Sequence, residues 1–463
     1  MGLVSVSCLW PIGKSFLSHL MLKLFLGIGI GLGFFSCFFF VWLSMFGPSS
    51  RGLKATLTGI VLLMGMILAY RVRKSGRLPA LELSGEPLPK LKLRWILGIL
   101  FLVSVVFAVA SFVFLALKKP HGDWDAWAIW NLRARFLFRG GNQWTSAFSS
   151  LMEGARPDYP LLVPSAIAGL WTCIGNDTVL VPALLSFLFT FAAVGLTVSS
   201  LAILRGKSQA FLAGVILLGT PFLITHGASQ YADVPLAFFF LGTLIFLALQ
   251  DRLPERSYNF LILAGLTAGF AAWTKNEGII FIAAIAVARL ITVAPTRGFK
   301  RYLRQMLSFG AGVAPALLIL IYFKVRLAPA NYLMAQGSQT TLQKLMDFSR
   351  HLQVWNAFAK ESVSFGGWAA VSVPLLLIFY ILFSGVSMKE TERPGIIASL
   401  LTVVFMLVAY ALTFVVTPFD IAWQLSTSLN RLLLQLWPSL IFVYFLIARP
   451  IELARAGQEP GTA

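Results

Sequence analysis

The sequence is poor in charge, because Asp, Glu, Lys and Arg make up only 12% of its 463 residues, against roughly 25% in soluble domains. This scarcity excludes a water-soluble fold of such length. Cysteine is scarce too, and Cys8, Cys37 and Cys173 show no CxxC spacing, so neither a disulfide framework nor a zinc site is indicated. The chain also lacks a P-loop, a GxSxG elbow and a dinucleotide fingerprint. No motif therefore indicates nucleotide hydrolysis or catalysis by a nucleophilic serine.

Apolar residues fill the chain instead, at 58% of the sequence with a mean hydropathy of +0.82. Runs of about 20 apolar residues suffice to cross a bilayer as helices, and the alternating pattern of membrane barrels is missing. The sequence therefore predicts an all-α polytopic membrane protein. The predicted spans, about twelve in number, are 22–46, 53–71, 95–117, 177–203, 209–225, 233–250, 260–274, 277–292, 306–326, 367–384, 395–416 and 432–448.

The net charge of +19 comes largely from Lys and Arg in short connections between these runs. Such a pattern reports topology rather than a nucleic-acid partner. It predicts an integral plasma (inner) membrane protein with both termini in the cytoplasm and two long outer segments, 118–176 and 327–366. The apolar stretch 160–174 is short and holds two prolines, so we expect it to lie at the membrane surface.

Three parts of the chain follow from this topology. Residues 1–94 form a two-helix N-terminal addition that ends in a cytoplasmic linker over 71–94, residues 95–448 form the main membrane domain, and residues 449–463 form a cytoplasmic tail. Chemistry is expected on the outer face, where the long segments and the polar hairpins lie.

The first outer segment begins HGDWDAWAIWNLRARFLFRGG, which brings Asp123 and Asp125 close to Arg133 and Arg135. A helix over 125–138 would be an amphipathic, membrane-lying helix. Its apolar face would hold Trp127, Trp130, Ala134 and Leu137. The alternative is an interfacial aromatic belt with snorkelling arginines.

Two further outer hairpins carry charge. Asp233 in HGASQYADVPLAFFF enters an apolar span, where a carboxylate is costly and therefore a functional candidate; a helix N-cap is the alternative. Lys275 and Glu277 in AAWTKNEGII lie at the depth of lipid phosphates, which an ammonium group can bind. Simple snorkelling of Lys275 is equally open.

The last outer hairpin, TPFDIAWQLSTSLNRLLLQLWPSL, places Trp423 and Arg431 before the final predicted span. A guanidinium at a helix start can bind a phosphate bidentately, although an interfacial arginine is the alternative. The second long segment, with Gln339, Lys344 and Trp355, is our expected acceptor contact.

In this order the motifs resemble the C-type superfamily of membrane glycosyltransferases, close to the protein O-mannosyltransferase and lipid A aminoarabinose transferase branches (family 39-like). The resemblance spans roughly 95–448. An acidic residue opens the first loop, DYPLL at 158–162 resembles a Tyr-Pro-Pro-Leu motif without its second proline, and DVPL, KNEG and an arginine seven residues before Pro438 match later motifs. The first loop has Asp-Ala where several relatives have Asp-Glu, so Asp123 and Asp125 both stay candidates.

The resemblance implies transfer of a sugar from a polyprenyl-phosphate donor to a hydroxyl on the outer face, with inversion. Asp125 or Asp123 would be the base, and Asp233 would position the acceptor or the donor sugar. Lys275 and Arg431 would bind the lipid phosphate, with Arg133 or Arg135 as helpers. Tyr159, Glu277 and Trp423 are the expected contacts to sugar or acceptor.

The partners implied are the lipid bilayer, the lipid-linked sugar and a glycan, lipid or protein acceptor, with no nucleic acid. The sequence shows no metal-ligand motif, but the resemblance leaves a divalent metal open. A transporter or flippase of lipid-linked sugars is the leading alternative, because it would also have many spans. A polymerase or ligase acting on lipid-linked oligosaccharides is a second one.

Overall fold

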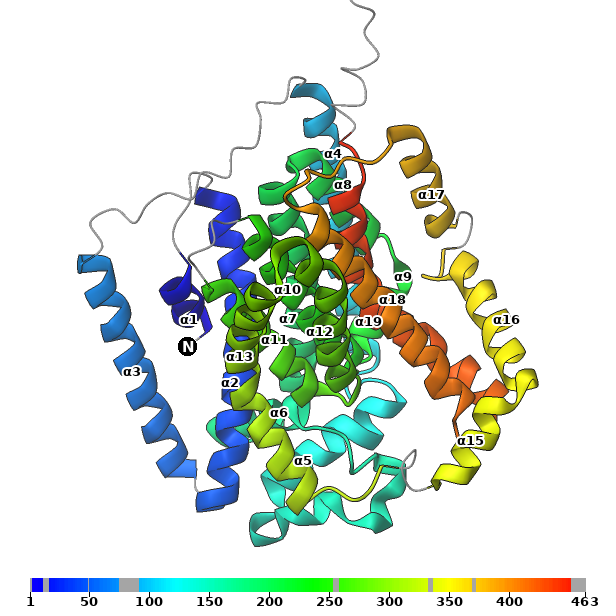
Figure 1. The fold of residues 1–463 in the computed structure, drawn as a ribbon. Coiled ribbons are helices and arrows are strands. Elements are labelled where there is room, and N and C mark those ends of the chain that lie inside the picture. The colour runs from blue at the N-terminus through cyan, green and yellow to red at the C-terminus, as the bar shows by residue number, and fades with distance from the viewer. Residues whose placement is uncertain are drawn as a thin grey trace, which may run out of the picture.

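The computed structural model describes residues 2–10, 16–48, 50–74, 91–252, 258–331, 336–368 and 372–450. In these ranges the chain is a bundle of helices without any β-strand, which confirms the predicted all-α membrane fold (Figure 1). The helices of the first half are α1 (Gly2–Leu9), α2 (Phe16–Phe46), α3 (Ser50–Lys74), α4 (Leu91–Lys118), α5 (Asn131–Arg139), α6 (Leu162–Ile174), α7 (Leu180–Leu204), α8 (Lys207–Leu218) and α9 (Pro221–Ala228).

The second half begins with the most buried helices of the bundle. Its helices are α10 (Asp233–Arg252), α11 (Asn259–Thr274), α12 (Glu277–Arg297), α13 (Phe299–Arg326), α15 (Ser338–Met346), α16 (Phe348–Ser364), α17 (Val373–Ser384), α18 (Arg393–Val415) and α19 (Ile421–Ile447). Helix α10 packs against α7, α11 and α19. In Figure 1, α3 lies at one edge of the bundle, and α16 and α17 lie at the opposite edge.

Eight of the helices in the described ranges are long and apolar enough to cross a membrane, and α8 with α9, bent by 60° at their junction, makes a ninth. The predicted count of about twelve is therefore not confirmed. The spans predicted at 260–274 and 367–384 correspond to α11, with 16 residues, and α17, with 12 residues. The span predicted at 53–71 corresponds to α3, which is not among the eight.

The final span begins earlier than predicted. Asp420 caps α19 by accepting a hydrogen bond from the backbone N–H of Trp423 at 2.7 Å, and the helix then runs without interruption to Ile447. The polar residues in the first part of α19 lower the local hydropathy, so hydropathy alone did not predict a helix there. As a result, Arg431 lies inside the last helix rather than in front of it.

The helix predicted over 125–138 forms, but as two pieces. A π-helical turn, Ala126–Trp130, leads into α5. Trp130, Ala134 and Leu137 are buried, and α5 packs on α6, whereas Trp127 is 45% exposed. The wider π turn shifts the register by about one residue, which explains why Trp127 leaves the predicted face.

Close helix contacts depend on glycine where α11 meets α13. A Cβ atom at Gly265 would lie 1.9 Å from the carbonyl oxygen of Phe309, and one at Gly312 would lie 2.0 Å from that of Ile262. Small residues let membrane helices approach each other closely. This contact fixes α11, and with it the position of the turn that follows it.

A buried ionic cluster lies at the C-terminal end of α10. Asp251 accepts two hydrogen bonds of 3.0 Å from Arg289 and pairs with Arg297 at 2.9 Å. Next to it, Arg252 pairs with Glu392 at 2.9 Å. These contacts tie α10 to the C-terminal half of α12 and to the residue that precedes α18.

The predicted domain boundaries stay predictions. Most of the linker over 71–94 and most of the tail over 449–463 lie outside the described residues. The stretch 160–174 forms the helix α6, and its place at the membrane surface stays a prediction.

Candidate active site

A cavity of about 920 Å³ opens where the ends of several helices meet. Its walls come from the segment after α4, from the turn between α9 and α10, from the turn between α11 and α12, and from α18 and α19. The cavity combines aromatic side chains with a few charged groups, as ligand sites usually do. Seven residues predicted from the sequence line it, namely Asp125, Tyr159, Asp233, Lys275, Glu277, Trp423 and Arg431.

Asp233 is the centre of the charged network and is fully buried. One of its carboxylate oxygens accepts a hydrogen bond from Lys275 Nζ at 3.0 Å and another from Gln435 Nε2 at 2.6 Å. The other oxygen accepts hydrogen bonds from Arg431 at 3.1 and 3.2 Å. A buried carboxylate needs such partners, and its place at the first turn of α10 is also favoured by the helix dipole. Asp233 therefore orients both cations.

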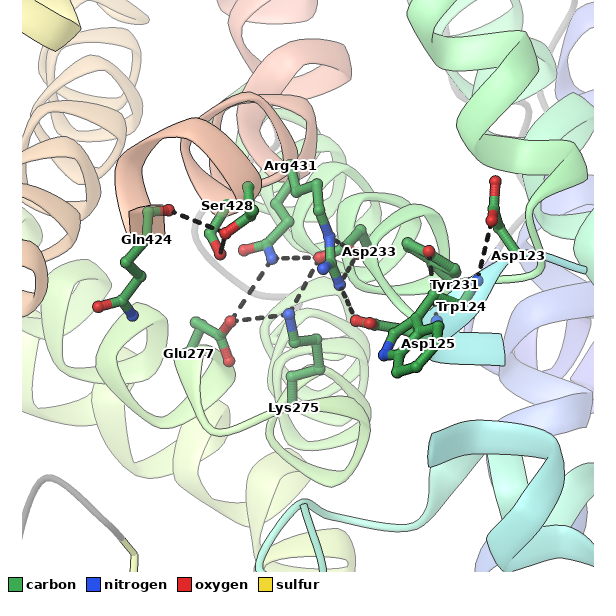
Figure 2. Close-up of polar contacts among 12 residues, drawn as sticks. Asp123, Trp124, Asp125, Tyr231, Asp233, Lys275, Glu277, Gln424, Ser428 and Arg431 are labelled. Atoms are coloured by element: carbon green, nitrogen blue, oxygen red, sulfur yellow. Dashed lines mark hydrogen bonds and ion pairs between the residues drawn. The ribbon is translucent and has the colours of Figure 1, made fainter. Parts of the chain in front are cut away.

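Arg431 joins the network to the segment that follows α4 (Figure 2). Its Nη2 donates to Asp125 Oδ2 at 2.6 Å, and its guanidinium lies 4.6 Å from the ring centroid of Tyr231. The hydroxyl of Tyr231 accepts the backbone N–H of Asp125 at 3.3 Å. The Asp125 side chain keeps 17% of its surface exposed, so its carboxylate is accessible from the cavity.

Lys275 follows the last residue of α11, and its ammonium group also pairs with Glu277 at 2.9 Å. Burial alone would lower the pKa of Lys275, but the carboxylates of Asp233 and Glu277 outweigh burial and hold this pKa above its usual value. Lys275 thus presents an ion-paired ammonium group at the cavity wall, 5.8 Å from the ring centroid of Tyr159.

Asp123 lies apart from the network, although it is only two residues from Asp125. Figure 2 shows its carboxylate pointing away from Arg431. It pairs with Lys119 at 2.7 Å and is 44% exposed. The hydrogen bond from Lys119 is the main reason why the pKa of Asp123 is lowered. Asp123 does not line the cavity.

The two arginines predicted as helpers also lie elsewhere. Arg133 is fully buried and donates to the carbonyl oxygen of Tyr159 at 2.6 Å. Arg135 pairs with Asp177 at 3.5 Å. Neither lines the cavity. The same is true of Gln339, Lys344 and Trp355, which were expected to contact the acceptor.

Several polar residues around the network were not predicted from the sequence. Gln435 lies four residues after Arg431 on α19, a spacing that puts both on one helix face. The hydroxyl of Tyr410 donates to Gln435 at 2.6 Å. Asp158, in the DYPLL motif, accepts hydrogen bonds from Asn276 at 3.1 Å and Asn331 at 2.7 Å.

Among the described residues there is no group of three or more His, Cys, Asp or Glu side chains arranged to hold a metal ion. The carboxylates of the cavity bind cationic side chains instead.

A family model matches part of the chain. Residues 158–323 match the family described as dolichyl-phosphate-mannose-protein mannosyltransferase. The matched segment contains Asp233, Lys275 and Glu277, and it confirms the predicted resemblance to membrane glycosyltransferases. No curated protein and no solved structure gives a significant match. The match and the apolar helices together support an integral membrane glycosyltransferase of the mannosyltransferase type.

Proposed function

We propose that the protein transfers a sugar from a polyprenyl-phosphate donor to a hydroxyl group of an acceptor on the outer face of the plasma (inner) membrane. The observation that carries this proposal is the convergence of Asp125, Asp233, Lys275 and Arg431 in one cavity. Two cations suited to a phosphate lie beside a carboxylate suited to a base. The mannosyltransferase family match supports the choice of a lipid-linked donor.

The cations would stabilise the leaving group. Lys275 and Arg431 both reach the cavity with a positive charge, and fixed charges of this kind stabilise the charge that develops on a departing phosphate. Asp233 holds the two cations in place through hydrogen bonds. Its full burial makes it a positioning residue in this proposal.

Asp125 would be the general base. It would take the proton of the acceptor hydroxyl while the acceptor oxygen forms a bond to the anomeric carbon of the sugar. The bond between this carbon and the phosphate oxygen breaks at the same time, and polyprenyl phosphate leaves with the electron pair. A single displacement of this kind inverts the anomeric centre.

The donor would also alter the base. In the structure Arg431 donates its shortest hydrogen bond in the network, at 2.6 Å, to Asp125. A donor phosphate would compete with Asp125 for this guanidinium. Donor binding would thus release the Asp125 carboxylate from Arg431 and leave it free to accept a hydrogen bond from the acceptor hydroxyl.

The test is an assay of the purified protein with polyprenyl-phosphate sugars and a membrane extract as the source of acceptor. Wild type is compared with Asp125→Asn, Asp123→Asn and Lys275→Ala. We expect transfer to be lost in Asp125→Asn and Lys275→Ala. Unchanged transfer in both would refute the site. Translocation of a lipid-linked sugar in liposomes, without transfer to any acceptor, would favour a flippase.

A further inference from the structure

Trp124 is a large apolar side chain at the cavity wall that the reaction described above does not use. It directly precedes Asp125 and lines the same cavity, yet 63% of its surface is exposed. Its indole contacts Trp127 edge to face, with ring centroids 4.5 Å apart. The described structure thus leaves an aromatic surface open beside the proposed base.

The backbone around Trp124 is held in place by contacts to two other segments. The backbone N–H of Trp124 donates to Asp123 Oδ1 at 3.0 Å, and the Asp123 carboxylate also pairs with Lys119. The N–H of Asp123 donates to the carbonyl oxygen of Ser229 at 3.1 Å. Together with the hydrogen bond from the backbone N–H of Asp125 to Tyr231, these contacts fix the backbone from which the Trp124 indole and the Asp125 carboxylate extend.

The cavity has two sides in Figure 2, with Lys275, Arg431 and Asp233 between them. Trp124 and Asp125 lie on one side, whereas Gln424 and Ser428 of α19 lie on the other. In an inverting displacement the acceptor approaches from the side opposite the leaving phosphate. The acceptor therefore belongs on the side of the base, which is the side of Trp124.

We infer that Trp124 forms the acceptor-binding platform and that the acceptor is a glycan, which presents a sugar hydroxyl to Asp125. The inference rests on the proposed function. An indole offers a rigid apolar surface with little conformational entropy to lose, and this surface matches the C–H face of a pyranose ring. The neighbouring carboxylate can accept hydrogen bonds from the sugar hydroxyls.

A polypeptide acceptor is one alternative, and the protease treatment in the experiment below tests it. A membrane-anchoring role for Trp124 is the other alternative, because tryptophan is enriched at membrane interfaces. Trp355 on α16, 71% exposed and outside the cavity, is a matched control for that role.

The experiment measures two reactions of a radiolabelled polyprenyl-phosphate sugar, which are transfer to a membrane extract of the source cells and hydrolysis by water. We expect Trp124→Ala to raise the KM for the extract about tenfold, and to leave the rate of donor hydrolysis and the KM for the donor unchanged. Trp124→Phe should retain most of the transfer, and Trp355→Ala should behave as wild type. The labelled product should resist protease.

Two results would overturn this inference while leaving the proposed function intact. One is equal transfer by Trp124→Ala and wild type, and the other is release of the label by protease, which would indicate a protein acceptor. If wild type neither transferred nor hydrolysed the donor, the proposed function would fail, and the inference with it.

Discussion

Asp123 and Asp125 illustrate how neighbours decide the role of a residue. Both are aspartates near the end of α4, and the sequence motif alone leaves them equivalent. In the structure, Lys119 holds Asp123 outside the cavity, whereas Arg431 and Tyr231 hold Asp125 inside it. The difference arises from residues about 110 and 300 positions away, which no local pattern could identify.

Replacing these two residues should therefore give different results. We expect Asp125→Asn to reduce the rate of sugar transfer by about 10²- to 10⁴-fold, which is the usual contribution of a general base. Asp123→Asn should keep most of the activity. Initial rates at saturating donor provide the measurement, and equal losses in the two variants would contradict the assignment.

Removing the Asp233 carboxylate should destabilise the protein. Asp233→Asn leaves the Lys275 and Arg431 cations near each other without their shared buried counter-charge. Breaking a buried ion pair in this way costs about 3–5 kcal/mol. Thermal unfolding in detergent should show a clearly lower unfolding temperature for this variant than for wild type.

The control for this measurement is Asp123→Asn, which breaks only the exposed pair with Lys119. Exposed pairs of this kind contribute about 0–1 kcal/mol. The double variant Asp233→Asn/Lys275→Met removes one of the two neighbouring cations and should recover part of the stability without activity. Equal unfolding temperatures for Asp233→Asn and wild type would contradict the buried network.

At the scale of elements, the turn between α11 and α12 carries Lys275 into the cavity. Gly278, at the start of α12, packs against the backbone of α11, and a Cβ atom there would lie 2.3 Å from the carbonyl carbon of Ala271. Backbone atoms cannot move away as a flexible side chain can. The glycine of the KNEG motif is thus required by packing.

We expect Gly278→Ala to displace α12 and to lower both folded yield and activity. Gly310→Ala in α13 is the matched control, because a Cβ atom at Gly310 would meet nothing within 4 Å. Size-exclusion profiles of the detergent-solubilised variants provide the measurement. Wild-type behaviour of Gly278→Ala would show that the turn can relax.

The elements also show where sequence reasoning succeeds. Long apolar helices such as α7, α10 and α13 were predicted because hydropathy reports them directly. The start of α19 was not, because its first part carries polar side chains toward the cavity. The displacement of Trp127 was not predictable either, since a π-helical turn leaves no periodic pattern in the sequence.

At the scale of the whole molecule, the predicted alternation of spans is what grouped part of the site before the structure was known. Hairpin ends on one side of a bundle meet even when they are far apart in the chain. Asp233, Lys275 and Arg431 could thus be assigned to one face. Contacts within that face, such as those of Gln435 and Tyr410, depend on helix rotation and depth, which the sequence does not specify.

The proposed sidedness can be tested with single cysteines in a background without Cys8, Cys37 and Cys173. We expect Leu345→Cys in α15 to react with a membrane-impermeant maleimide from outside intact cells. Lys300→Cys, near the start of α13, should react only after permeabilisation. The reverse pattern would place the cavity on the cytoplasmic face.

The bilayer itself should influence activity through α10. Asp233 and Asp251 tie the two ends of this helix to neighbouring helices by buried ion pairs. They are 18 residues apart, or about 27 Å along the helix axis, close to the hydrocarbon thickness of about 30 Å. We expect activity in reconstituted vesicles to peak at one acyl-chain length and to fall for shorter and longer lipids; a flat dependence would contradict this.

A helix fastened at both ends cannot tilt or slide to suit a thinner or thicker membrane without breaking those ion pairs. The lipids must then adjust to the protein, at a cost of a fraction of a kcal/mol per Å of mismatch. The two aspartates of α10 thus fix the distance between the charged ends of the bundle core, and we expect membranes of different thickness to support activity to different degrees.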